Sequence, residues 1–283
     1  TTTFTGATSA GSYDLTATAR IVAFSTLTAT GVGHISLASD SIDFAGNVSG
    51  SGTITLADFN NDASIGVDGG AGTLALTNAE LAYLQDGFSQ IIIGNGTTGT
   101  ITIGSGGHSY LDNVHFKAGG TTGNIDLEAS PTIAAGNNLT FTLGSNAAMV
   151  LDYDLQTDGG DITLNGALAV DGTRTIDTES GADGAGGSLS ITGAIDSTDV
   201  SGDTLSIDVS GNSNGSVDLS SDVGATNDLT GFSVNGGATQ VDLADVGVTG
   251  GDIAVTGDNI DLNGDSYVAT TSGSINYTGA VDL

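Results

Sequence analysis

The chain has 283 residues and a formal net charge of −30, because only three Lys and Arg side chains stand against 33 carboxylates. That balance excludes binding to nucleic acid or to an anionic membrane through a basic patch, which needs clustered Lys and Arg. With 46 Gly, one Pro, no Cys and no Trp, the sequence offers many turns and little material for a conventional core of large side chains. No run approaches the ~20 apolar residues of a membrane-spanning helix, so no membrane insertion is expected.

The first 76 residues repeat at a period close to 20. Phe4, Phe24 and Phe44 recur at this interval, and so does a second apolar series: Leu15, Ile35, Ile54 and Leu74. A chain rich in Gly, Ser and Thr must first be tested as disordered, but a fixed period with short strands favours a solenoid, whose coils bury their apolar faces only when stacked. We therefore expect about four coils here, with the phenylalanines stacked inside.

A short helical insertion is predicted next. Thr77 and Glu80 form a capping box, Leu81 and Leu84 give an apolar edge, and Gly87 stands where a helix stops. Alternating apolar pairs, typical of half-buried strands, flank the insertion: Leu74/Leu76, Ile91/Ile93 and Ile101/Ile103. The pattern predicts a helix over residues 78–86 between minimal strands.

The rest of the chain continues this unit at looser spacing. Apolar residues separated by one residue, mostly Thr, Asp, Ser or Ala, recur as inward-facing pairs: Ile125/Leu127, Phe141/Leu143, Ile162/Leu164, Leu189/Ile191, Leu205/Ile207, Val217/Leu219, Val241/Leu243, Ile253/Val255, Ile260/Leu262 and Ile275/Tyr277. Gly-rich segments at 181–188 and 211–216 are predicted loops. The final apolar residues come every six to eight positions, as on three faces of a triangular coil: Ile253, Ile260, Tyr267, Ile275 and Val281.

These patterns predict an all-β fold: a parallel β-solenoid with coils of about 20 residues and one short helical insertion. We expect residues 1–283 to form a single continuous solenoid. Phe4 is already in the repeating register and Val281 lies in mid-strand, so we expect either an excerpt of a longer chain or a subunit that stacks end to end on further copies.

Two stretches carry a resemblance to a known family: GGTTGNIDLEASPTIAAGNNLTFTLGSNAAMVLDYDLQTDGGDITLNG at 119–166 and TNAELAYLQDGFSQIIIGN at 77–95. They resemble large secreted bacterial exoproteins of the filamentous haemagglutinin type. The resemblance implies a right-handed parallel β-helix, export to the cell surface, and a structural or adhesive role in adhesion, aggregation or biofilm. Its implied partners are further copies of the chain, cell-surface glycans or other cells.

The chemistry-bearing residues form no recognisable catalytic motif. His34, His108 and His115 are widely spaced, and neither a Gly-Xaa-Ser-Xaa-Gly elbow with partners nor a phosphate loop is present. A polysaccharide lyase would have to take its base from the three basic residues, Arg20, Lys117 and Arg174. An ice-binding array would need unbroken threonine pairs, whereas aspartates interrupt the series Thr53/Thr55, Thr100/Thr102 and Thr140/Thr142. We therefore expect a protein that is not an enzyme.

Calcium is the one ligand that the composition suggests. Oxygen donors of the kind that calcium prefers gather in two places: Asp258, Asp261, Asn263 and Asp265 in the first, and Asp58, Asn60, Asn61 and Asp62 in the second. In the first stretch Asn259, Asp261, Asn263 and Gly264 imitate the start of an EF-hand loop, but Thr270 stands in place of the bidentate Glu. The alternative is that these residues serve turns and solubility. The alternative function is therefore a calcium-dependent surface-layer or polysaccharide-binding β-helix, and no cofactor is required otherwise.

Overall fold

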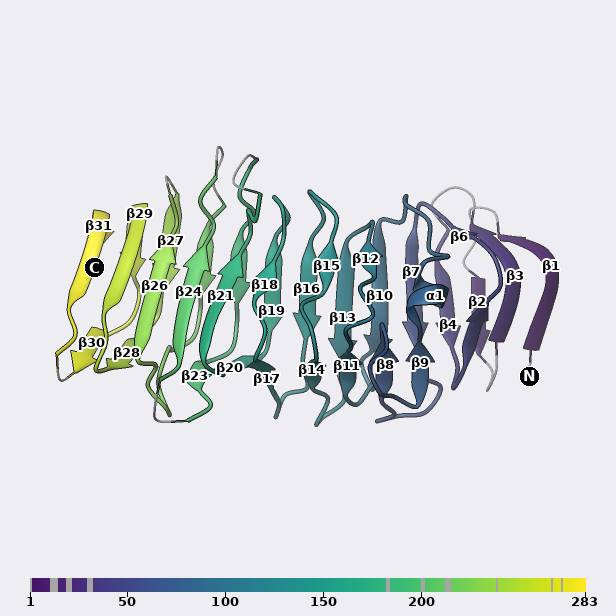
Figure 1. Ribbon diagram of the computed structural model, residues 1–283, viewed down its shortest axis with the longest axis horizontal. Coiled ribbons are helices and arrows are strands. Elements are labelled where there is room, and N and C mark those ends of the chain that lie inside the picture. The colour runs from purple at the N-terminus through teal and green to yellow at the C-terminus, as the bar shows by residue number, and fades with distance from the viewer. Residues whose placement is uncertain are drawn as a thin grey trace. The chain divides into compact units, whose positions relative to one another are not determined.

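The computed structural model describes residues 2–10, 15–18, 22–29, 33–181, 184–199, 202–211, 215–237, 239–265, 267–270 and 272–283. In these residues the chain forms 31 β-strands and one four-residue helix. The strands stack on one another in parallel, coil upon coil (Figure 1). The predicted class, an all-β parallel β-solenoid with one short helical insertion, is confirmed.

The chain divides into two compact units, residues 1–134 with 141–147 and residues 135–140 with 148–283. The first unit contains β1 (Thr2–Ala10), β2 (Leu15–Thr18), β3 (Val22–Ala29), β4 (Ile35–Ala38), β5 (Ile42–Phe44), β6 (Val48–Ser49), β7 (Thr53–Ala57), β8 (Ile65–Val67), β9 (Leu74–Leu76), α1 (Asn78–Leu81), β10 (Gln90–Asn95), β11 (Ile101–Ile103), β12 (Ser109–Tyr110), β13 (Val114–Ala118), β14 (Ile125–Leu127) and β15 (Thr132–Ile133). The residues of β16 (Leu139–Thr142) are divided between the units. One continuous solenoid over residues 1–283 stays a prediction.

The second unit contains β17 (Ala148–Leu151), β18 (Leu155–Gln156), β19 (Ile162–Asn165), β20 (Ala167–Val170), β21 (Thr173–Asp177), β22 (Leu189–Ile191), β23 (Ile195–Ser197), β24 (Thr204–Asp208), β25 (Val217–Leu219), β26 (Gly231–Asn235), β27 (Gln240–Leu243), β28 (Val246–Thr249), β29 (Ile253–Leu262), β30 (Tyr267–Thr270) and β31 (Ile275–Asp282). The predicted loops at 181–188 and 211–216 lie partly outside the described residues, and their described residues belong to no strand.

The predicted phenylalanine register is correct in the first unit. Phe4 pairs with Phe24 and Phe24 with Phe44 in the ladder β1–β3–β5. The rings of Phe24 and Phe44 are buried and stack with centroids 6.3 Å apart. In the described part of residues 1–76 this ladder holds three strands, which gives three coils where about four were expected.

The second predicted ladder is correct only as far as Ile54. Leu15 pairs with Ile35 and Ile35 with Ile54, but the next residue in the ladder is Ile91 of β10 and not Leu74. Leu74 instead lies in β9, which pairs with β8 on the side away from β11. The prediction failed here because the chain makes an excursion through β8, β9 and α1 before it returns to the ladder.

The excursion depends on glycines that no other residue could replace. The segment between β8 and β9 folds so tightly that a Cβ on Gly72 would lie 1.9 Å from the backbone nitrogen of Gly66. A Cβ on Gly70 would lie 2.2 Å from the carbonyl oxygen of Thr102. Backbone therefore packs directly on backbone, which is possible only where the side chain is a hydrogen atom.

The capping box predicted for the insertion is present, but the helix is shorter than expected. Thr77 accepts a hydrogen bond from the Glu80 backbone, and the Glu80 carboxylate accepts one from the Thr77 backbone. The helix ends at Leu81 because the following backbone pairs with Val48: Val48 N–H donates to Tyr83, and Gln85 N–H donates to Val48. Among the residues that the structure describes, no helix is long and apolar enough to span a membrane.

The second unit shows the predicted three-sided coil. One face stacks β19, β22, β25, β27 and the second half of β29, and another stacks β18, β21, β24, β26 and the first half of β29. The last coil follows: Ile275 and Val281 of β31 pair with Ile253 and Ile260, and Tyr267 pairs with Val246 on the third face.

The inward apolar pairs of this unit are buried, with one exception. Ile275 of β31 is 40 % exposed, because β31 has one pairing partner in the described residues, β29. Coil length also departs from the expected 20 residues, since Ile162 pairs with Leu189 and Leu189 with Val217. The additional residues lie in the segments between strands, where a solenoid accepts insertions.

Candidate functional site

The outward face of the second unit carries a row of aspartates in successive coils. Asp218 of β25 pairs with Asp242 of β27, Asp242 with Asp261 of β29, and Asp261 with Asp282 of β31. We call these four residues the aspartate row. Parallel strands lie about 4.8 Å apart, and like charges directly opposite one another are destabilising. Such a row is chemically suited to a divalent cation or to hydrogen-bond donors such as sugar hydroxyls.

Of the four residues predicted to bind calcium near the C-terminal end, only Asp261 belongs to the aspartate row. Asp258 lies in β29 and is exposed, and Asn263 follows β29 and donates its N–H to the Leu243 carbonyl. Asp265 lies in the next loop, where its N–H donates to Asp245 Oδ1 at 2.5 Å. In the described part of the chain, no group of three or more His, Asp or Glu residues is placed to hold a metal ion. Calcium binding by the predicted four stays a prediction.

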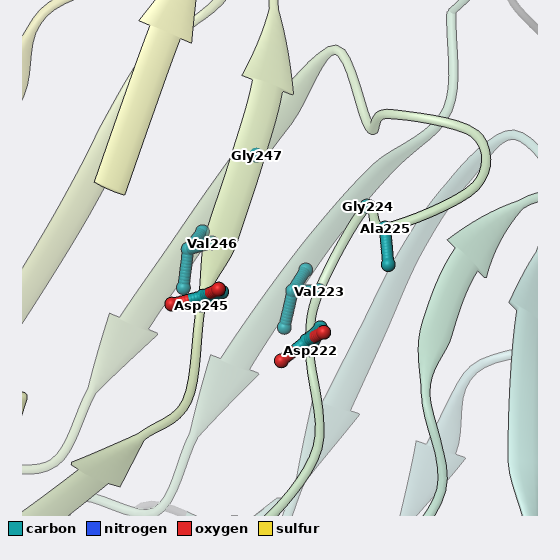
Figure 2. A pocket seen from close by; sticks show the side chains of 7 residues that line it. All are labelled: Asp222, Val223, Gly224, Ala225, Asp245, Val246 and Gly247. Atoms are coloured by element: carbon teal, nitrogen blue, oxygen red, sulfur yellow. The ribbon is translucent and has the colours of Figure 1, made fainter. Parts of the chain in front are cut away.

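A polar hollow of about 290 Å³ lies at a coil corner of the second unit (Figure 2). Figure 2 shows the carboxylates of Asp222 and Asp245 at the same level of two neighbouring coils, beside Val223 and Val246. The two valines are bridged as parallel neighbours, which fixes the spacing of the aspartates that precede them. Glycine and alanine complete the lining, so backbone and two carboxylates are what a ligand would meet.

A second hollow of about 310 Å³ is lined by Thr226, Asn227, Asp228 and Thr249. The Thr249 hydroxyl donates to the Asp228 carboxylate, and the backbone N–H groups of Thr226 and Asn227 donate to Asp196 Oδ1 at 2.8 and 3.2 Å. These bonds hold the loop in place and leave a surface of hydroxyl and amide groups. Such a surface can bind sugar hydroxyls or a hydrated cation.

Buried carboxylates at the coil corners are the feature that sequence reasoning missed. Asp112 is 5 % exposed, and burial raises its pKa, against hydrogen bonds from the backbone of Gly87 and Phe88 that lower it. The Gly87 N–H lies 2.9 Å from Asp112 Oδ1 and comes from the preceding coil. No local pattern around Asp112 signals this bond, because the partner is distant in sequence.

Asp58 and Asp203 are buried in the same way, with 4 % and 3 % of their surface exposed. Asp58 is one of the residues that the sequence associated with calcium, but its burial was not expected. Asp203 accepts hydrogen bonds from Gly172 N–H and from the hydroxyls of Ser197 and Thr198. Burial alone would raise the pKa of Asp203, but these bonds together outweigh it and leave the pKa below its usual range.

The three histidines have unrelated surroundings. His34 Nδ1 accepts the N–H of Thr53, the His108 ring packs edge-on against Tyr110, and His115 Nε2 lies 2.9 Å from the Thr142 hydroxyl. Burial lowers the pKa of both His108 and His115. The structure therefore places each ring against a different structural neighbour.

Some of the basic and threonine residues weighed for lyase or ice-binding activity have identifiable structural neighbours. Arg174 donates to the carbonyls of Leu151 and Thr173, and Arg20 lies outside the described residues. Thr102 is flanked in register by Gly66 and Asp126, so the threonine array is interrupted between neighbouring strands.

Comparison with models of known protein families, with curated proteins and with solved structures finds no match to this chain. The resemblance to exoproteins of the filamentous haemagglutinin type therefore stays a prediction.

Proposed function

We propose that this chain is a structural and adhesive extracellular protein, a rigid β-helical stalk or filament segment for cell-surface adhesion, aggregation or biofilm. The observation that supports this function best is the apolar ladder inside each unit. In the second unit it is formed by Ile162, Leu189, Val217, Val241 and Ile260, each paired with the next. Because every coil buries its apolar side chains on its neighbours, such a protein can be long without needing a larger core.

The outward residues suit the same function. The intervening positions of this ladder are polar: they carry Thr163, Ser190, Asp218, Asp242 and Asp261, and the three aspartates contribute to the net charge of −30. Repulsion between strongly acidic surfaces keeps neighbouring fibres apart unless specific contacts join them. The proposal requires no cofactor and no catalytic residue.

Self-association or continuation of the coil is part of the proposal. Ile275 and Val281 on β31 are each about two-fifths exposed, whereas their pairing partners in β29, Ile253 and Ile260, are buried. A further parallel strand laid on β31 would cover Ile275 and Val281 and pair with the backbone of β31. That strand would belong either to the same polypeptide or to a second copy.

Adhesion is tested by coating beads with the folded chain and measuring their attachment to bacterial cells and to immobilised cell-surface glycans. We expect attachment above that of beads coated with an unrelated acidic protein of equal charge, and loss of attachment after the coils are unfolded. Negative-stain electron microscopy and sedimentation at rising concentration test assembly. The proposal is wrong if the folded chain neither attaches to any surface nor associates with itself.

A calcium-dependent surface-layer or polysaccharide-binding β-helix is the second candidate, because the aspartate row and the two hollows lie in the same unit. The test compares retention on immobilised acidic and neutral polysaccharides with and without calcium. The test variant carries both Asp242→Asn and Asp261→Asn, which remove the two middle carboxylates of the row. Its matched control is Asp43→Asn, which removes an exposed charge elsewhere. Retention that depends on calcium and is lost only in the first variant favours this candidate.

A further inference from the structure

Asp58 is a buried carboxylate of which one oxygen has no hydrogen-bond partner. It follows β7 directly and is 4 % exposed. Its Oδ1 accepts a hydrogen bond of 2.5 Å from the hydroxyl of Thr98, which is itself fully buried. Its Oδ2 is buried and has no hydrogen-bond partner. An unpartnered buried carboxylate oxygen costs free energy unless a proton or a cation satisfies it.

The charges that act on Asp58 are negative. Asp62 and Asp40 are the acidic neighbours that disfavour its ionisation, in addition to burial. Asn60 Nδ2 donates to Asp40 Oδ1 at 2.8 Å, which ties the start of the loop to the preceding coil. The neighbourhood thus contains three carboxylates and an amide, the oxygen-rich composition that attracts a hard cation.

Backbone oxygens of Thr97 and Thr98, the residue whose hydroxyl contacts Asp58, lie beside Asp62 next to Gly120. Asp62 has a positive φ of 58° and donates its N–H to the Thr97 carbonyl at 2.7 Å, so the loop is folded back onto Thr97 and Thr98. A Cβ built on Gly120 would lie 2.8 Å from Asp62 Oδ1, 2.8 Å from the Thr98 carbonyl oxygen and 3.2 Å from the Thr97 carbonyl oxygen. Three oxygens therefore converge beside a residue that has no side chain.

We propose that this corner binds one calcium ion, with Asp58 and Asp62 as the carboxylate ligands and the carbonyl oxygens of Thr97 and Thr98 beside them. Calcium accepts six to eight oxygen ligands in flexible geometry, so two carboxylates, carbonyls and water suffice. Asp58 supplies the buried anchor and the exposed Asp62 supplies the opening to solvent. The ion would join the β7–β8 and β10–β11 connections of neighbouring coils. This site is distinct from the aspartate row and does not depend on the adhesive function.

The test is calorimetric titration of calcium chloride into the whole chain after treatment with a chelator, with magnesium chloride as a second probe. We expect one saturable site that is at least tenfold weaker in Asp58→Asn and in Asp62→Asn. The matched control is Asp126→Asn, which removes one exposed carboxylate from β14 and leaves this affinity unchanged. Circular dichroism confirms that each variant is folded, and Asp62→Asn changes only an exposed side chain, so it remains informative if Asp58→Asn is unstable.

A melting experiment separates calcium from a proton at Asp58. Calcium should raise the melting temperature of the unaltered chain by mass action and raise that of Asp58→Asn much less. Equal calcium affinity in Asp58→Asn and Asp126→Asn, or no saturable binding in the unaltered chain, would overturn the proposal. Asp58 would then be a buried protonated acid, which a carbon-13 titration of its carboxyl group would show.

Discussion

Ile54 and Asp58 lie four residues apart and both are buried, but Ile54 needs apolar neighbours and Asp58 needs a hydrogen-bond partner. Ile54 is in the coil interior, between Ile35 and Ile91 in the ladder, where each neighbour is another apolar side chain. Asp58 is at the coil corner, where its partner is the hydroxyl of Thr98 from the next coil. The interior repeats one kind of contact from coil to coil, whereas each corner has contacts of its own.

That difference predicts where the protein is sensitive to substitution. An interior residue contributes burial, which any apolar residue of suitable size supplies in part. A corner residue either makes a specific hydrogen bond or is a glycine at a close contact between two backbones. Few other residues can replace it in either case. The predictions below test the two regions against each other, beginning with the largest expected loss of stability.

The largest loss is expected in the interior, from Phe24→Asp. Phe24 is 2 % exposed and lies between Phe4 and Phe44 in the ladder, so the change removes a buried ring and introduces an unpaired charge. Loss of a buried Phe alone costs about 3–5 kcal/mol, and the buried carboxylate adds to this cost. Urea denaturation followed by circular dichroism measures the free energy of unfolding.

The matched control is Tyr153→Asp, which places the same charge on a side chain that is 40 % exposed. We expect this variant to differ from the unaltered chain by about 0.5 kcal/mol or less. Equal stability losses in the two variants would mean that the phenylalanine ladder does not form the interior.

A smaller but still large loss is expected at a corner, from Asp203→Ala. The change removes the acceptor of the part-buried Gly172 N–H and one of the two acceptors of the Ser197 hydroxyl, which also donates to the Asp199 carbonyl, so we expect a loss of about 1–3 kcal/mol in all. Asp203→Asn keeps one oxygen and should lose less. Thermal melts of both variants at neutral pH give the comparison, and equal melting temperatures for Asp203→Ala and the unaltered chain would contradict it.

The pH dependence of Asp203 has a definite sign. Its pKa in the folded chain is lower than the usual 3.8, so the unfolded chain takes up the proton first. The stability that this residue contributes is therefore complete above pH 3.8 and is lost as the pH falls further.

The sequence predicted the interior well because alternation of apolar residues acts over two or three positions. The pairs Leu205/Ile207 and Val241/Leu243 are buried as expected, and the three-sided order of the last coils is confirmed by strand pairing, although Ile275 and Val281 are exposed. It failed for Leu74, because period alone cannot distinguish a residue in the ladder from one on an excursion of similar length. The corners could not be predicted, since the bond between Asp58 and Thr98 joins residues 40 positions apart.

A moderate loss is expected from Gly187→Ala, at another kind of corner. A Cβ on Gly187 would lie 2.1 Å from the carbonyl oxygen of Gly160 in the neighbouring coil, so the two backbones must separate. Overpacking of this kind costs about 1–3 kcal/mol. Gly96→Ala is the control, because no heavy atom lies within 4 Å of the added Cβ. Melting temperatures should fall for Gly187→Ala alone, and an equal fall in both would argue against direct stacking of the coils.

The smallest effect is expected from His115, an outward residue of β13 that is only partly buried. Burial, with a smaller contribution from Lys117, lowers its pKa from 6.5 to about 4. The folded chain therefore keeps the ring neutral, while the unfolded chain takes up a proton below pH 6.5. The stability that this residue contributes is thus complete above pH 6.5 and declines as the pH falls toward 4.

His115→Gln keeps a hydrogen-bonding group near the Thr142 hydroxyl but does not titrate. Because carboxylates also titrate at the lower end of this range, the measurement is the difference in unfolding free energy between the two proteins from pH 7.5 to 4.5. We expect that difference to shift toward the glutamine variant as the pH falls, by less than the full pKa shift would give because the ring is partly solvated. A difference that is constant over this range would mean that His115 titrates as it does in water, and that the outward surface of β13 lacks the burial that lowers its pKa.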